Sequence, residues 1–150
     1  MCDGTSVQDP CWKKVTKPEF VYYGSCLGGF TVKNAVLWEC DRCGSITLLA
    51  SICKDWEAQK AVEIIENSNV FTGIEIRFIR ELCRKTHVEF ALELDIARSD
   101  YLLLEVGAGI TSAVCRMIAR HFLRQGNHLD GLHPLRQARI REKVHMETED

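Results

Sequence analysis

A chain of 150 residues with a formal net charge of −2 can form one ordinary domain or two small ones. Apolar residues make up 46% of the sequence and charged residues 27%, which is the composition of a soluble globular protein. No window approaches the ~18 uninterrupted apolar residues of a membrane-spanning helix. Residues 1–4 include no basic stretch leading into an apolar one, so we expect a cytoplasmic protein without a secretory signal.

The first half of the chain carries the signals of β structure. Residues 1–19 show no periodicity, and we expect a loose N-terminal arm there. Runs of β-branched and aromatic residues, separated by glycine and asparagine, follow at 20–23, 30–32, 36–38 and 45–50. These runs predict a small antiparallel β module of three or four strands. From about Ile52 the apolar residues recur with a helical period, so residues 20–69 are predicted to contain the β module and a linking helix.

The next segment, residues 70–126, is predicted to be helical. Thr72 with Glu75, and Thr86 with Glu89, match the Thr-x-x-Glu capping box that starts a helix. Asp95 stands where a short turn is required, and aspartate tolerates the left-handed conformation. These signals predict helices over 72–85, 86–94 and 98–105, and a fourth that ends before Gly126. Residues 127–150 are a charged tail, and past Pro134 it is predicted to be frayed helix or disorder.

The predicted helices over 86–94 and 98–105 are joined by a turn of three to four residues, which is a helix-turn-helix pattern. The predicted fold class is therefore α+β, with an antiparallel β module followed by an all-α domain. Spacing alone leaves two functions open, a DNA-binding motif or an ordinary helical bundle without a role in DNA binding. We do not expect an enzyme, because the five histidines fall in different elements and no nucleophile has a neighbouring base.

Several segments resemble one known family in the same order. Residues 71–80, Phe-Thr-Gly-Ile-Glu-Ile-Arg-Phe-Ile-Arg, are similar to the segment that opens the helical domain in the MqsA-type, or YgiT-type, zinc-finger/helix-turn-helix antitoxins and regulators. Residues 86–105 follow the repressor pattern of that family. Residues 23–27 and 39–44 resemble its Gly-Ser-Gly-Leu and Cys-x-x-Cys-Gly segments. The resemblance extends over about residues 20–122.

The resemblance implies a fold and a function. The fold would be a β-rich zinc-binding module followed by an all-α, repressor-like (Xre/Cro-type) helix-turn-helix domain. The function would be that of a sequence-specific transcriptional regulator that binds double-stranded promoter DNA as a homodimer. Many members of this family also neutralise a small toxin, so the chain is a candidate antitoxin with a cognate toxin as partner.

The cysteines suggest a metal site in the β module. Cys40 and Cys43 have the spacing of a zinc knuckle, and Gly44 suits the tight turn that aims both sulfurs at one point. Zinc needs four ligands, and Cys11 and Cys26 are the nearest candidates for the remaining positions. Two alternatives stay open. One is a pair that has lost its partner ligands. The other is a redox pair, which would require a depressed thiol pKa.

The helix-turn-helix geometry nominates residues for contact with DNA, because the start of the second helix meets base edges in the major groove. Arg98 and Ser99 are the candidates for bases, and Tyr101 for a base or sugar. His87 stands where the resembling family has a glutamine that holds a phosphate or base. Arg98 is the strongest single candidate, since a guanidinium can grip guanine O6 and N7 with two hydrogen bonds.

Two further features allow different functions. A basic stripe is predicted on the helix 72–85, formed by Arg77, Arg80 and Arg84. It could follow phosphates, or it could instead be a solvated face balanced by Glu75 and Glu81. The apolar run 102–104 beside Asp100 departs from the repressor pattern. It allows a protein-interaction module on a repressor fold that has lost DNA binding.

Overall fold

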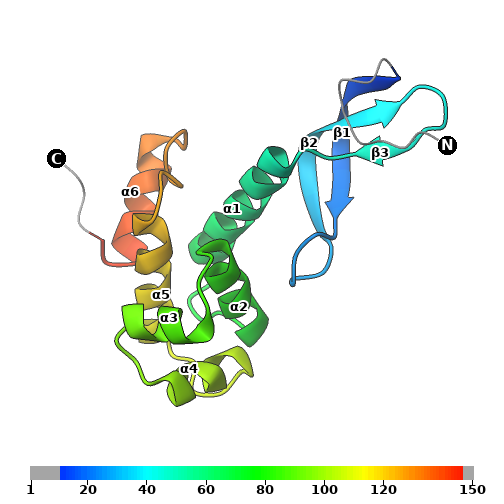
Figure 1. Ribbon diagram of the computed structural model, residues 1–150. Coiled ribbons are helices and arrows are strands. Elements are labelled where there is room, and N and C mark those ends of the chain that lie inside the picture. The colour runs from blue at the N-terminus through cyan, green and yellow to red at the C-terminus, as the bar shows by residue number, and fades with distance from the viewer. Residues whose placement is uncertain (1–10, 147–150) are drawn as a thin grey trace. The chain divides into compact units, whose positions relative to one another are not determined.

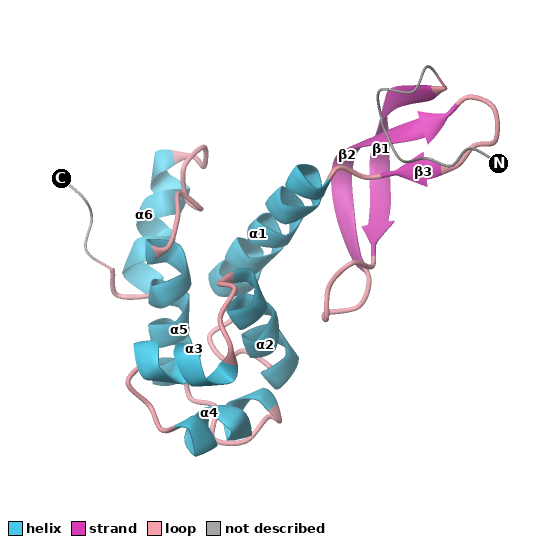
Figure 2. Cartoon of the chain, in the orientation of Figure 1, coloured by secondary structure: helices cyan, strands magenta, loops and turns pink. Residues whose placement is uncertain are grey.

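The computed structural model describes residues 11–146 and shows an α+β chain, a three-stranded antiparallel sheet followed by six helices (Figures 1 and 2). The chain divides into two compact units, residues 1–57 and 58–150. Among the described residues, no helix combines the length and apolar character needed to cross a membrane. The elements are β1 (Trp12–Tyr22), β2 (Phe30–Cys40), β3 (Ile46–Thr47), α1 (Ala50–Asn67), α2 (Gly73–Leu82), α3 (His87–Glu93), α4 (Arg98–Glu105), α5 (Ser112–Arg124) and α6 (Pro134–Lys143).

The sheet is a long hairpin of β1 and β2, with the short β3 paired to the other edge of β2. The register runs from the pair Trp12–Cys40 to the pair Tyr22–Phe30. It lacks the pair at Pro18, a residue without the N–H that a ladder needs. The β1 strand is an edge strand, where proline is tolerated.

The sheet differs from the sequence prediction in three places. Residues 12–19, predicted as part of a loose arm, form most of β1, because they pair with the second half of β2. The predicted runs 30–32 and 36–38 belong to one continuous strand. The predicted run 45–50 contributes only the two residues of β3, and α1 already begins at Ala50. Residues 1–10 of the predicted arm lie outside the described residues.

Lysines are the reason why the first strand escapes sequence analysis. Lys13 and Lys17 on β1 form ion pairs across the hairpin with Asp41 (3.6 Å) and Glu39 (3.2 Å), respectively. Lysine has a low intrinsic strand propensity, yet it is common on edge strands, where it discourages pairing with another chain. The strand is therefore established by its partner and not by its own composition.

The first unit has a small aromatic core. Tyr22, Ala35 and Trp56 are buried together, so the first turns of α1 pack on the hairpin. The rings of Tyr22 and Trp56 meet edge to face at 5.6 Å, and the Tyr22 hydroxyl donates a hydrogen bond of 2.8 Å to Glu57 Oε1. Burial, followed by the bond to Glu57, raises the pKa of the Tyr22 phenol.

The start of α2 is determined by local interactions. The Glu75 N–H donates to Thr72 Oγ1 at 3.2 Å, and the Thr72 N–H donates to Glu75 Oε1 at 2.8 Å, so the predicted capping box is confirmed. Phe71, just before the N-cap, and Ile76, in the first turn of the helix, stand at the two positions of a hydrophobic staple. Both side chains are buried. A Cβ at Gly73 would lie 2.4 Å from the carbonyl oxygen of Glu105, so the glycine allows the ends of α2 and α4 to approach closely.

The segment that contains α3, the following turn and α4 also follows its local signals. Thr86 caps α3 by accepting a bond of 3.2 Å from the Glu89 N–H. The reciprocal bond of a full capping box, from the Thr86 N–H to the Glu89 carboxylate, is missing within the described part of the chain. Asp95 has a φ of 57°, which confirms the predicted left-handed turn before α4.

The predicted frayed or disordered tail is wrong for residues 134–143, which form α6. Pro134 occupies the first turn, where its missing N–H costs nothing. Ile140 and Val144 are buried in the second unit. Arg136 binds both carboxylate oxygens of Glu66 at 2.7 and 3.0 Å. These contacts join the tail to α1, seventy residues earlier. Residues 147–150 lie outside the described residues.

Thr72→Ala is expected to lower the free energy of unfolding by about 1 kcal/mol, because it leaves the Glu75 N–H without an acceptor. The change is measured by urea denaturation, monitored through the far-UV circular dichroism signal of the helices. Thr72→Ser retains the acceptor oxygen and is the matched control. Equal losses in both variants would show that the hydroxyl bond is not the stabilising element.

Candidate nucleic-acid interface

The α3–turn–α4 segment presents the start of α4 to solvent. Arg98 and Ser99, the first two residues of α4, are both exposed. Ala97 precedes them as N-cap and provides no side-chain hydrogen bond to the helix. Within the described part of the chain, Arg98 makes no ion pair, either with the nearby Asp95 or with another acid. An arginine, a hydroxyl and uncapped backbone N–H groups therefore lie together at one helix end.

Tyr101 does not share this surface, and its predicted contact with a base or sugar is wrong for this geometry. Its side chain is completely buried and meets Phe90 edge to face at 5.5 Å. Its hydroxyl donates a 2.7 Å hydrogen bond to Glu105 Oε1. Burial, followed by this bond, raises the pKa of the phenol. The three-residue spacing between Tyr101 and the buried Leu104 is the sequence signal for an inward face.

Arg80 is likewise internal, so the predicted phosphate stripe is not formed. The side chain is only 8% exposed, and its Nε donates to Glu105 Oε1 at 2.6 Å. Its Nη1 donates to the backbone carbonyl of Lys85 at 2.9 Å. Arg77 remains on the surface, where it pairs with Glu81 four residues later at 2.9 Å. Of these two arginines of the predicted stripe, Arg80 is a core residue and Arg77 belongs to a surface ion pair.

Glu105 is the central residue of this region, and sequence analysis assigned it no role. One carboxylate oxygen accepts bonds from Arg80 and Tyr101, and the other lies 3.0 Å from His87 Nε2. Burial opposes the charge of the carboxylate, but the hydrogen bonds outweigh it and leave the pKa of Glu105 below its ordinary value. His87 is therefore engaged with Glu105, although part of its ring remains accessible.

The segment 87–105 carries five carboxylates and only one arginine. Two of these acids are neutralised locally. Glu105 has the partners described above, and Glu93 pairs with Lys85 at 3.0 Å and with His121 at 2.8 Å. The bond from Lys85 is the main reason that the pKa of Glu93 is lowered. Asp100 lies in the first turn of α4 and is exposed. It is the acid nearest to Arg98 in sequence.

The second predicted site, the cysteine pair, lies on the turn between β2 and β3. Gly44 adopts a φ of 73°, and its N–H donates to the Cys40 carbonyl at 3.0 Å. The Arg42 N–H points at Cys40 Sγ over 3.4 Å. The N–H of Asp41 donates to the carbonyl of Cys11 at 2.9 Å, which brings the Cys11 backbone beside the turn. Cys40 is buried, whereas Cys43 is exposed.

Cys26 cannot join these cysteines in one metal site. It lies in the connection after Tyr22, at the opposite end of the hairpin from Cys40. Ten residues of strand separate the two ends, which amounts to roughly 33 Å at the usual rise per residue. Across residues 11–146, no three cysteine, histidine or acidic side chains are grouped as a metal site requires. The described residues thus bring together Cys40, Cys43 and the backbone of Cys11, and they exclude Cys26.

Comparisons of the chain with models of protein families, with curated proteins and with solved structures find no match.

Arg80→Met is expected to destabilise the helical unit by about 3 kcal/mol, because it leaves the buried Glu105 carboxylate without its main cationic partner. Arg77→Met is the matched control on the same helix, and its exposed pair with Glu81 should contribute less than about 1 kcal/mol. Urea denaturation of both variants checks the difference. Equal effects would contradict a structural role for the buried pair.

Proposed function

We propose that the helical unit is a helix-turn-helix that binds double-stranded promoter DNA, with the start of α4 in the major groove. The observation that carries this proposal is the exposure of Arg98 and Ser99 on the first turn of α4, after a left-handed turn at Asp95. The first residues of the second helix are those that reach base edges in this class of motif.

The side chains at this end suit distinct parts of DNA. The Arg98 guanidinium can donate two hydrogen bonds to guanine O6 and N7, and the Ser99 hydroxyl can bond to a base or a phosphate. The free N–H groups of the first turn favour a phosphate oxygen. Leu103, one turn further along α4, is 52% exposed, and an apolar side chain at that place can contact a thymine methyl group.

The buried network determines which charges meet the DNA. Arg80 and Tyr101 hold Glu105 away from the surface, so this carboxylate adds little repulsion. Asp100 is different, because it is exposed beside Arg98. Affinity for DNA comes largely from cations that displace counterions from phosphates, and an exposed acid opposes that gain. The proposal therefore includes moderate, salt-sensitive binding in which Asp100 lowers the affinity.

We extend the proposal to a transcriptional regulator that acts as a homodimer. Two recognition helices, one DNA turn apart, read a palindrome that a single helix cannot. The β unit would then be available for a partner protein, and a cognate toxin is the partner that the family resemblance suggests. The chain would in that case be the antitoxin of a toxin–antitoxin pair.

We also propose that Cys40 and Cys43 on this turn bind zinc, and that Cys11, whose backbone lies beside the turn, moves its side chain to become a further ligand on binding. The bond from the Arg42 N–H to Cys40 Sγ supports a thiolate at that position, as does the short turn at Gly44. The buried indole N–H of Trp12, in the same cluster as Cys11 and Cys40, lacks an acceptor in the described part of the chain. Zinc would supply a cross-link between the turn and the start of β1.

The zinc proposal predicts about one zinc per chain in protein purified without chelator. Cys43→Ser should abolish binding, because it removes a ligand from an exposed position that the core does not need. Cys26→Ser, at the far end of the hairpin, is the matched control and should retain the metal. Elemental analysis of the three proteins is the measurement. A metal-free wild type would refute the proposal.

For DNA, Arg98→Ala is expected to weaken binding to the specific operator by about 1–3 kcal/mol and to relax its sequence preference. Asp100→Thr should strengthen binding or shift the preferred sequence, because it removes an anion from the groove face. Gel shifts over a range of salt, with the duplex upstream of the protein's own coding region, measure both effects. Arg139→Ala, an exposed change on α6, is the matched control and should bind as the wild type does.

A second function is favoured by a specific observation, an apolar groove beside α4. The groove has a volume of about 440 Å³ and includes Ile96, Leu103 and Val114, with Asp95 and Asp100 at its polar positions. This surface would suit a partner protein with an apolar, basic segment. If neither the wild type nor Asp100→Thr shifts the duplex at low salt, DNA binding fails and this docking function replaces it.

A further inference from the structure

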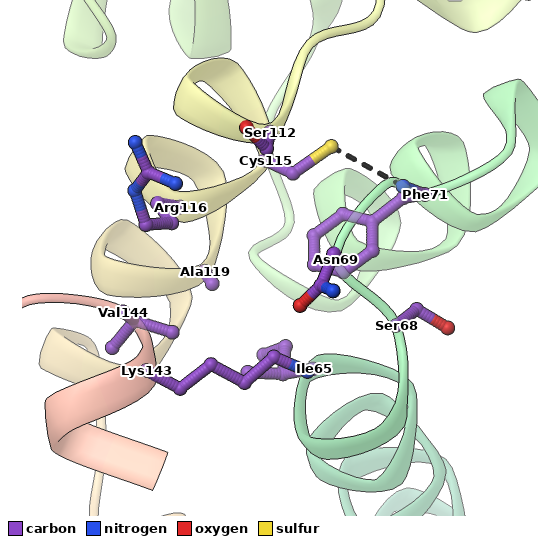
Figure 3. Close-up of a pocket in the computed structure, with 10 residues that line it drawn as sticks. All are labelled: Ile65, Ser68, Asn69, Phe71, Ser112, Cys115, Arg116, Ala119, Lys143 and Val144. Carbon is purple, nitrogen blue, oxygen red and sulfur yellow. Dashed lines mark hydrogen bonds between the residues drawn. The ribbon is translucent and has the colours of Figure 1, made fainter.

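A separate cavity lies in the helical unit, away from the exposed end of α4. It has a volume of about 370 Å³ and is formed by the end of α1, the segment after it, the first turns of α5 and the end of α6 (Figure 3). This volume falls within the range of small-molecule sites. Because three segments distant in sequence (65–71, 112–119 and 143–144) contribute to it, the cavity is a product of the tertiary structure.

One part of the cavity wall is apolar. Ile65, Phe71 and Ala119 line it, and each of these side chains is almost completely buried. Cys115 belongs to the same wall, and its Sγ accepts a hydrogen bond of 3.2 Å from the Phe71 N–H, drawn as the dashed line in Figure 3. Burial raises the pKa of the Cys115 thiol, so this residue is a neutral part of the wall and not a nucleophile.

The charged part of the cavity is entirely cationic. Arg116 from α5 and Lys143 from α6 line it, together with the polar side chains of Ser68, Asn69 and Ser112, and no acidic residue takes part. Arg116 is half-buried and makes no ion pair within the described part of the chain. A half-buried guanidinium without a carboxylate partner is a binding group for an external anion.

The positive charge of Lys143 is also only partly balanced by its neighbours. Its ammonium donates a 2.6 Å hydrogen bond to the backbone carbonyl of Glu66. The carboxylate of that same residue is occupied by Arg136, through both oxygens. An ammonium has three N–H donors, so Lys143 can donate to a further partner. Desolvation lowers its pKa, as expected for a cation that lacks a full counter-charge.

We propose that this cavity binds a small organic carboxylate, with its anionic end on Arg116 and Lys143 and its apolar body against Ile65, Phe71 and Ala119. The polar side chains of Ser68, Asn69 and Ser112 offer further hydrogen bonds to the anionic end. Such a ligand would connect α1, α5 and α6 and stabilise the helical unit in proportion to its affinity. The site uses none of the residues assigned above to DNA, so it does not depend on that function.

The test uses phenylbutyrate as the probe and phenylbutyramide as its neutral isostere, each titrated into the full chain and followed by amide NMR. Phenylbutyrate is expected to shift the resonances of Phe71, Cys115 and Ala119 in a saturable way. The amide should bind at least about tenfold more weakly, because it lacks the charge that Arg116 and Lys143 recognise. Inorganic phosphate should also bind more weakly than phenylbutyrate, since it lacks the apolar body.

Two variants on α5 complete the experiment. Arg116→Gln should weaken phenylbutyrate binding by about tenfold, the loss of one charge-assisted contact. Arg124→Gln, an exposed position on the same helix that does not line the cavity, should bind as the wild type does. The absence of saturable shifts at the cavity residues would overturn the proposal. So would equal binding of the carboxylate and the amide, or unchanged binding in Arg116→Gln.

Discussion

The arrangement of α2, α3 and α4 depends on one buried carboxylate. Glu105 receives Arg80 from α2, His87 from α3 and Tyr101 from its own helix. A buried charge is tolerated only when its hydrogen-bonding capacity is filled, so these helices must keep the positions that fill it. Gly73 makes the same junction possible from the backbone side, because any larger residue would meet the Glu105 carbonyl oxygen. The α3–turn–α4 geometry follows from this junction.

The same network determines the chemistry of the surface. It withdraws Arg80 and Tyr101 from solvent, and it engages His87. The residues that remain available on α4 are Arg98 and Ser99, followed by Asp100 and the exposed leucines. A surface with one strong cation, one acid and an apolar continuation differs from a uniformly basic DNA-binding face. In the functions proposed above, the choice between DNA and a protein partner would therefore depend on a few side chains of α4 and not on the net charge of the chain.

In the β unit, strand register decides which cysteines can cooperate. Cys11 and Cys40 meet because the hairpin pairs Trp12 with Cys40. The same register places Cys26 at the other end. In the sequence, all four candidate ligands, Cys11, Cys26, Cys40 and Cys43, could belong to one site. In the structure, three of them lie near the β2–β3 turn, and Cys26 lies at the far end of the hairpin. This register could not be predicted from the sequence, because the lysines of β1 have a low strand propensity and the strand forms only by pairing with β2.

The sequence by itself determined the α+β class, the helix starts at Thr72 and Thr86, the turn at Asp95 and the bounds of α4. These features depend on hydrogen bonds and dihedral preferences within about four residues, which the local sequence specifies. The tertiary structure decided that Arg80 and Tyr101 are internal, that β1 begins at Trp12, that α6 is ordered and that a cationic cavity forms beside α5. Each of these outcomes requires a partner far along the chain, as Arg80 requires Glu105 twenty-five residues away, and local patterns carry no information about such partners.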